Sequence, residues 1–187
     1  MKTKLLAFLS IVLLSLTSSC ELFNQLDDVT FDIVLMHPKE VDENLTGSNV
    51  TYTDVQTLNA SAHPDIDKYK DKIESFTVNR VTYTIKNFAS DDGSTVNFSN
   101  GSTSFSAVGA SSGSVIATVS NVDLLSAATS EDEFDLDVNA AGLEEIANYL
   151  KNDLAVKIYS SGTLSKIPVS FTVETRMYVT VVAGALN

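Results

Sequence analysis

Hydrophobic and polar residues alternate with a period of two along most of the chain beyond residue 28. This alternation, rich in β-branched and aromatic residues, is typical of half-buried strands. It predicts strands over residues 29–36, 50–57, 76–88, 95–98, 103–108, 114–122, 134–138, 154–164 and 167–183. The sequence is therefore expected to fold mainly as β-structure.

Turn residues divide these predicted strands. Pro38 is expected to end the first strand, and a change of parity predicts a bulge near Asn79 and Arg80. Asn100-Gly101 predicts a hairpin turn, and Ser165-Lys166 is expected to turn a long final hairpin.

Two segments have helical spacing instead. Residues 139–152 carry an apolar stripe of Leu143, Ile146, Ala147 and Leu150, and Asn139 can cap their start. A second, short helix is predicted over residues 64–74. Many short strands with one or two helices predict a single β-sandwich domain over residues 29–187.

The beginning of the chain differs from the rest. Lys2 and Lys4 precede a twelve-residue stretch, 5–16, with ten apolar members. That stretch is too short to span a bilayer as a helix and has the length of a signal-peptide core. Residues 1–19 are therefore predicted to be a signal peptide.

The end of this leader resembles a lipoprotein processing site. Leu16-Thr17-Ser18-Ser19-Cys20 is similar to the bacterial lipobox in the looser form of Bacteroidota lipoproteins, although Thr17 stands where the pattern has Leu. The resemblance implies lipid attachment at Cys20, a tether over residues 20–28, and a place in the cell envelope, at the outer membrane. The alternative is an ordinary secreted protein with an unpaired cysteine.

The last third of the chain resembles a second family. Residues 155–159 (AVKIY), 162–164 (GTL) and 167–169 (IPV) follow the predicted helix in a pattern similar to late-embryogenesis-abundant type-2 domains. That resemblance implies an immunoglobulin/fibronectin-like β-sandwich.

Charge and cysteine content narrow the choice of partners. The 187 residues carry a net charge of −12, which does not favour nucleic acid, and the single cysteine excludes an intrachain disulfide. The expected partners are the membrane, through lipidated Cys20, and another envelope protein.

Few residues offer catalytic or metal chemistry. His37 and His63 each precede a proline and are interpreted as boundary residues, so we expect no enzyme and no cofactor. Asp135, Asp137 and Asn139 resemble the start of a calcium loop, but Ala140 and Ile146 replace its required Gly and Glu. Strand alternation, with the carboxylates facing water, is the simpler account.

These observations give three hypotheses. The first is a membrane-anchored cell-envelope lipoprotein that acts as a non-enzymatic binding or structural module. The second is a carrier or sensor of an apolar ligand, held between the sheets or under the helix at 139–152. The third is a hydrolase.

Overall fold

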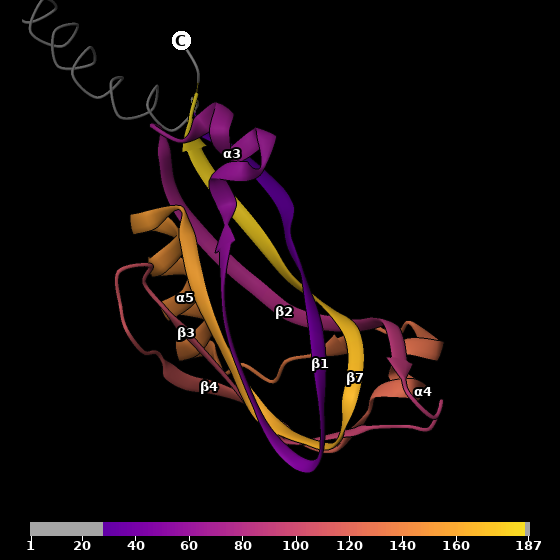
Figure 1. Cartoon of the computed structure of the whole chain (residues 1–187). Coiled ribbons are helices and arrows are strands. Elements are labelled where there is room, and N and C mark those ends of the chain that lie inside the picture. Colours follow the sequence, from indigo (N-terminus) through magenta and orange to yellow (C-terminus); the bar gives the residue numbers. More distant parts are fainter. Residues whose placement is uncertain (1–27, 186–187) are drawn as a thin grey trace, which may run out of the picture.

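Two long antiparallel strands form the frame of the molecule. The computed structural model describes residues 28–185, and in it β1 (Asp28–Asn59) pairs with β7 (Ala155–Gly184) from one end to the other. The ribbon bends back on itself where the β1 register shifts between Glu43 and Gly47 (Figure 1). We call residues 28–43 of β1 its first limb and residues 47–59 its second limb.

The shorter strands extend each half of this ribbon into a layer. β2 (Ile73–Ser90) pairs with the later part of β7 and with β6 (Phe134–Asp135). β3 (Asn97–Ser106) pairs with the earlier part of β7, with β4 (Ser114–Val119) and with β5 (Val122–Asp123). The result is a mainly β, antiparallel sandwich in which β1 pairs with β7 alone among the described strands.

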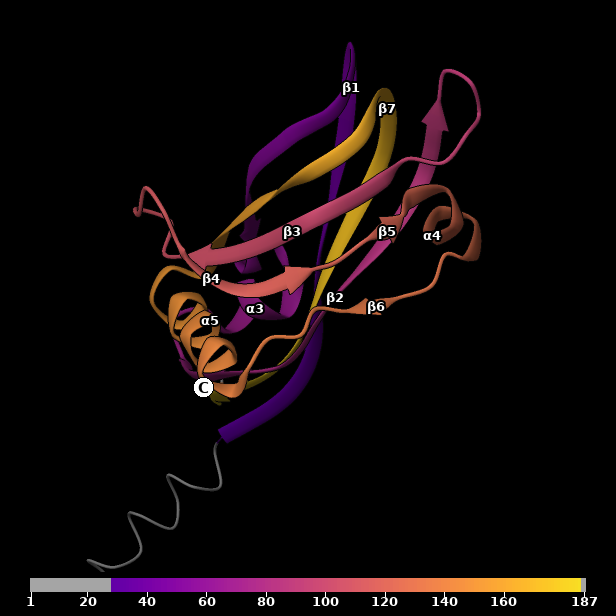
Figure 2. The same ribbon diagram turned by 90° about the horizontal axis from the view of Figure 1, so that it is seen from below.

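Short helices complete the two ends. The 3-10 helix η1 (Ala60–Ala62) and α3 (Pro64–Tyr69) connect β1 to β2, while α4 (Leu124–Ser130) and α5 (Ala140–Asp153) lie at opposite ends of the sandwich (Figures 1 and 2). Side-chain caps explain where the two longer helices begin. The Asp123 carboxylate accepts from Ser126 N, and the Asn139 amide oxygen accepts from Gly142 N, each at 2.9 Å.

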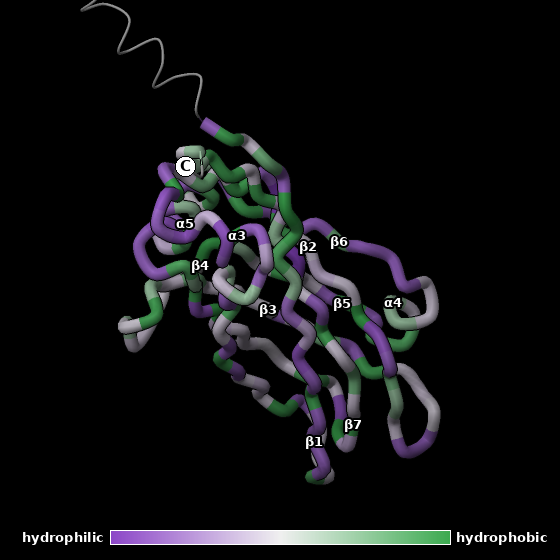
Figure 3. Tube along the Cα trace, turned by 90° about the horizontal axis from the view of Figure 1, so that it is seen from above, coloured by the Kyte–Doolittle hydropathy of each residue, from purple (hydrophilic) through white to green (hydrophobic). Residues whose placement is uncertain are grey.

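The hydrophobic core consists of two clusters. One packs under α5 and includes Leu35, Ile146, Leu150 and Met177; the other packs beside α4 and includes Val41, Leu124, Leu164 and Phe171. Both contain inward residues from β1 and β7, because each strand runs through both layers. The tube coloured by hydropathy shows hydrophobic and hydrophilic stretches following each other along β1 (Figure 3).

Several sequence predictions are confirmed. The structure is mainly β, α5 begins after Asn139, and the β2 register shifts between Val78 and Arg80, where a bulge was predicted. The short helix before β2 is also present, although it ends at Tyr69.

The predicted strand ends were wrong in three places. β1 continues through Pro38, since an edge strand needs no N–H on its free side. β3 continues through Asn100, whose φ of 51° accompanies a register shift between Ser99 and Ser102, so Asn-Gly forms a bulge instead of a turn. β7 continues through 165–166 because its residues on both sides stay paired with β1.

The connectivity also departs from the expected immunoglobulin/fibronectin-like sandwich. In that fold each strand belongs to one sheet, whereas β1 and β7 here contribute to both layers. The predicted signal peptide, Cys20 and nearly all of the predicted tether lie outside the described residues; Asp28, the last tether residue, instead begins β1.

Candidate functional site

Polar side chains interrupt the inner face of β1. The two-residue alternation turns His37 and Lys39 of the first limb inward, together with Tyr52, Asp54 and Gln56 of the second limb. Because the ribbon doubles back, these two groups face each other across the gap between the layers. The interruption lies between the two core clusters.

An ion pair links the two limbs. The Lys39 Nζ atom lies 3.0 Å from an Asp54 carboxylate oxygen, and the side chains are 36% and 15% exposed. A partly buried pair is screened less by solvent than a surface pair. This contact therefore joins the two limbs across the gap between the layers.

Burial changes the titration of two neighbours of this pair. The pKa of His37 is lowered, first by burial and then by the positive charge of Lys39, with Asp54 acting in the opposite direction. The pKa of the Tyr52 hydroxyl is raised well above its ordinary range, by burial and by the carboxylates of Asp54 and Glu43. Both side chains are thus held in their neutral forms near neutral pH.

A cavity opens between the layers behind the ion pair. Its volume is about 90 Å³. Phe105 and Ile158 from one core cluster and Ile85 and Phe171 from the other line its walls. The cavity therefore separates the two clusters.

Gln56 lines this cavity and has a buried polar atom without a partner. Its side chain is 9% exposed, and its amide oxygen Oε1 accepts no hydrogen bond from the described residues. Leaving a buried acceptor unpaired destabilises the fold by about 1–3 kcal/mol.

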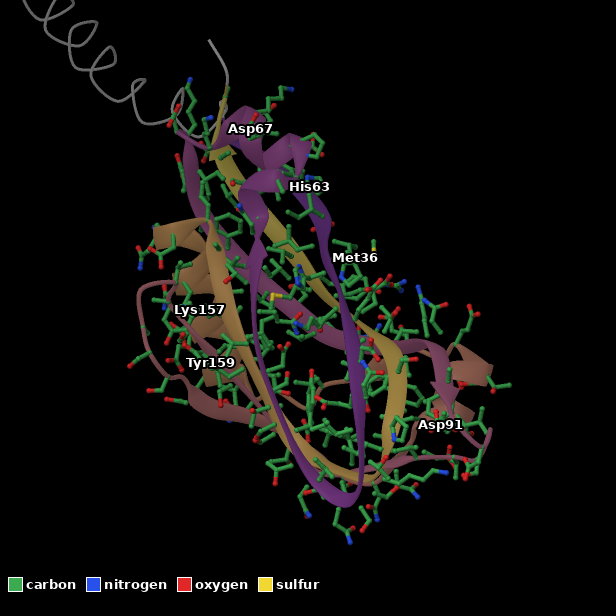
Figure 4. All side chains as sticks on the ribbon, viewed as in Figure 1. Met36, His63, Asp67, Asp91, Lys157 and Tyr159 are labelled. Carbon is green, nitrogen blue, oxygen red and sulfur yellow. The ribbon has the colours of Figure 1, made fainter. Side chains whose placement is uncertain are left out.

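The outward side chains of β1 differ between its limbs. Those of the first limb include Asp32, Glu40 and Asp42 and the ring of Pro38, features that discourage a strand edge from pairing. Two apolar side chains, Val34 and Met36, are exposed among them, and Met36 projects from the ribbon in Figure 4.

The second limb carries no outward charge. Its outward side chains are uncharged: Asn49, Thr51, Thr53, Val55, Thr57 and Asn59. Val55 is 53% exposed. This part of the edge has the composition of a strand that can accept another strand.

The structure gives each predicted site residue a place. His63 caps α3, with Nδ1 accepting from Asp65 N at 3.3 Å (Figure 4). Asp135 pairs with the Arg80 guanidinium at 2.5 Å, Asp137 is exposed, and Asn139 caps α5.

These placements do not form a metal centre. Within residues 28–185, no three His, Cys, Asp or Glu side chains come together in a geometry that could hold a metal ion. Nor does any helix in that range have the length and apolar character needed to cross a membrane.

Gln56 and the Lys39–Asp54 pair were missed by sequence reasoning. The signal was available, because the second limb was predicted as a strand and its parity places Gln56 on the same face as Leu58. What the sequence does not reveal is that the first limb folds back to face it.

Comparison with known proteins gives only structural matches. No family model matches the chain, and no curated protein matches it. The structure of Desmodium yellow mottle tymovirus is 10% identical, covers 84% of this chain and 85% of that one, and has a TM-score of 0.39. The decameric BFDV capsid protein is 10% identical, with 82% and 98% covered and a TM-score of 0.43. Tobacco necrosis virus is 11% identical, with 84% and 98% covered and a TM-score of 0.37.

These findings correct the family expected from the sequence. The matching structures are viral proteins, and neither the Bacteroidota lipoprotein nor the late-embryogenesis-abundant type-2 identification is supported by a family model or a curated relative. The identification of the chain as a Bacteroidota lipoprotein, and the envelope-module function drawn from it, are therefore wrong. Lipid attachment at Cys20 and a place at the outer membrane stay predictions, because they depend on residues outside those that the structure describes. With TM-scores below 0.5, the viral structures in turn assign no function to this chain.

The alternative of an apolar-ligand carrier is corrected as well. The space between the sheets is not wholly apolar, since Gln56, Asp54 and Lys39 line it together with the phenylalanines.

Proposed function

We propose that this protein is a structural, non-enzymatic β-sandwich subunit of the jelly-roll type, which associates with a second copy through the second limb of β1. The observation that carries the proposal is the free edge of that limb, with its row of uncharged, β-branched outward side chains. A strand edge of this kind offers unpaired N–H and C=O groups to another strand.

Charge favours the second limb over the first limb of the same strand as the place where two copies meet. The chain carries a net charge of −12, so two copies repel each other on approach. The first limb adds to the repulsion through its outward acidic residues, whereas the second limb presents none. Two molecules therefore repel each other less along residues 50–59 than along the first limb.

The sequence of the second limb is compatible with a twofold axis. Antiparallel pairing centred on Val55 places that residue opposite its own copy and places Thr53 opposite Thr57. All three are β-branched, and such cross-strand pairs stabilise antiparallel sheets. Self-pairing of one surface patch is the usual form of a homodimer contact.

Sedimentation equilibrium of the full-length chain tests the proposal. The wild type should dimerise reversibly, and Val55→Lys should raise the dimer dissociation constant at least about tenfold, or about 1.4 kcal/mol, by placing two like charges opposite each other. The matched control is Val34→Lys, which changes an exposed valine on the first limb and should leave the association unchanged. A wild type that stays monomeric up to about 1 mM would refute the proposal.

Crosslinking tests the register separately. In a Cys20→Ala background, Val55→Cys should form a disulfide-linked dimer on mild oxidation, because the two residues 55 are directly opposite. Val34→Cys in the same background should stay monomeric. Equal crosslinking of both variants would contradict the proposed axis.

A further inference from the structure

Residues 131–139 form a strap that runs from α4 to α5 and covers the edge of β2 that faces away from β7 (Figure 2). Two ladder pairs, at Thr82 and Tyr83, join the strap to β2 through β6. One further backbone bond runs from the Leu136 N–H to the Val81 carbonyl oxygen, at 2.9 Å. Few backbone bonds therefore hold the strap to the sheet.

The strap also lacks a buried anchor of its own. All nine residues from 131 to 139 are exposed or only partly buried, whereas α4 buries Leu124 and Ala127 and α5 buries Ile146 and Leu150. A segment with little buried apolar surface can open locally at a lower free-energy cost than the whole fold. The strap can therefore open while the two helices at its ends stay in place.

Glu133 connects the strap to the outer face of the sheet. One of its carboxylate oxygens lies 2.9 Å from the Arg176 guanidinium, and the other lies 3.3 Å from that of Arg80. It also accepts a hydrogen bond from the Tyr178 hydroxyl at 2.7 Å. Since Arg80 belongs to β2 and the other two to β7, one carboxylate links the strap to both strands.

The strap is strongly acidic, so these contacts are needed to keep it attached. Five of its nine residues carry carboxylates, in a chain whose net charge is −12. Among the described residues, Arg80 and Arg176 pair with two of these carboxylates, those of Glu133 and Asp135. Without such pairs, repulsion from the acidic chain would favour the detached strap. Glu133 makes two of the three ion pairs.

The strap forms part of the wall of the cavity between the layers. Leu136 lines the cavity from the strap, and Tyr83 lines it from β2. The Phe134 ring covers Tyr83, with ring centroids 5.4 Å apart and planes inclined by 25°. Detachment of the strap removes Leu136 from the wall and Phe134 from Tyr83, which opens the cavity to solvent.

We propose that the strap is a gate to this cavity: it leaves β2 as one unit while the rest of the fold stays intact, and Glu133 is the latch that holds it closed. The gate is independent of the proposed self-association. The strap pairs with β2, whereas the second limb of β1 pairs with the part of β7 that belongs to the other layer.

Amide hydrogen exchange of the full-length chain tests the opening. The Leu136 N–H should exchange at least about tenfold faster than the slowest amides of β7. Its rate should not change with urea below the unfolding transition, because a local opening exposes little surface. Glu133→Gln keeps the size of the side chain and removes its charge, so it should speed this exchange at least about fivefold, still without urea dependence. The matched control is Asp132→Asn, an exposed neighbour that should leave the rate unchanged.

Thiol labelling tests whether the opening reaches the cavity. Ile85 lines the cavity and is 3% exposed, so in a Cys20→Ala background Ile85→Cys should react with a small thiol reagent only through the open state. Adding Glu133→Gln should raise the labelling rate by the same factor as the Leu136 exchange rate. Labelling that follows urea-induced unfolding instead would overturn the gate. A Leu136 rate that follows the β7 amides in urea, or one that Glu133→Gln leaves unchanged, would overturn it as well.

Discussion

Lys39 and Asp54 belong to one strand, yet their side chains meet across the gap between two layers, with Nζ and the carboxylate oxygen 3.0 Å apart. Fifteen positions separate them along β1, and the fold of the β1–β7 ribbon brings them together. The pair stands at the polar interruption between the two core clusters. The contact can therefore form only when the two limbs of β1 face each other as they do in this fold.

A double-mutant cycle should measure the interaction energy between Lys39 and Asp54. Lys39→Met and Asp54→Asn should each lower the free energy of unfolding, and the double variant should lose less than the sum. We expect a coupling energy of about 0.5–1 kcal/mol, because both charges are partly exposed. Chemical denaturation at low and high salt gives the value, which should shrink in high salt. Additive effects would mean that the pair does not form.

Gly162 is expected to be intolerant of a side chain. A Cβ atom there would lie 2.2 Å from Cζ of Phe98, the ring that lines the cavity. Gly162→Ala should therefore lower the free energy of unfolding by about 1–3 kcal/mol, as overpacked cores do. Thermal or urea unfolding would measure the loss.

The chain offers a matched control for this substitution. A Cβ atom at Gly109 would have no heavy atom within 4 Å, so Gly109→Ala should change stability little. Combining Gly162→Ala with Phe98→Leu should recover part of the loss if the ring is the obstacle. If the double variant were as unstable as Gly162→Ala alone, the Phe98 ring would not be the obstacle.

The sequence predicted the local structure better than the path of the chain. Alternation identified the strands and their inward faces, because burial of one face determines which residues alternate. The helix α5 was predicted because its cap and apolar stripe are local. Asn100-Gly101 and Pro38 are local turn signals too, yet both lie inside continuous strands, since pairing with β7 extends on either side of them.

The candidate site was harder to predict because it depends on distant contacts. Parity alone places Gln56 inward, but its unmet hydrogen bond follows from which residues face it across the fold. The same holds for Phe98, which packs over Gly162 more than sixty residues later. Attachment through Cys20 stays a prediction, because that residue lies outside residues 28–185.

Substitution of Asn139 distinguishes a helix-capping role of this residue from a calcium-binding role. As the N-cap of α5 its amide oxygen accepts from Gly142 N at 2.9 Å, so Asn139→Ala should lower the free energy of unfolding by about 1 kcal/mol. Asp137→Ala, at an exposed neighbouring position, should have little effect. Melting curves with millimolar calcium and with chelator should coincide for wild type. A rise in melting temperature with calcium that both substitutions abolish would establish the metal site instead.

His37 should make stability depend on pH below about 7. Burial and the charge of Lys39 lower its pKa in the folded state, whereas the unfolded chain titrates near the ordinary value of 6.5. As pH falls through 6.5, the unfolded state therefore binds a proton more readily than the folded state, and the free energy of unfolding decreases. The decrease ends once the pH passes below the folded pKa.

Urea unfolding at a series of pH values from 7.5 to 5 would measure this slope, above the range in which most carboxylates titrate. His37→Gln removes the titrating group and should flatten the slope in that window. Lys39→Gln keeps His37 but removes the second cause of its lowered pKa, so it should reduce the slope without abolishing it, because burial remains the larger cause. A wild-type slope that His37→Gln leaves unchanged would assign the pH dependence to other groups and would contradict the burial of a neutral His37 beside the ion pair.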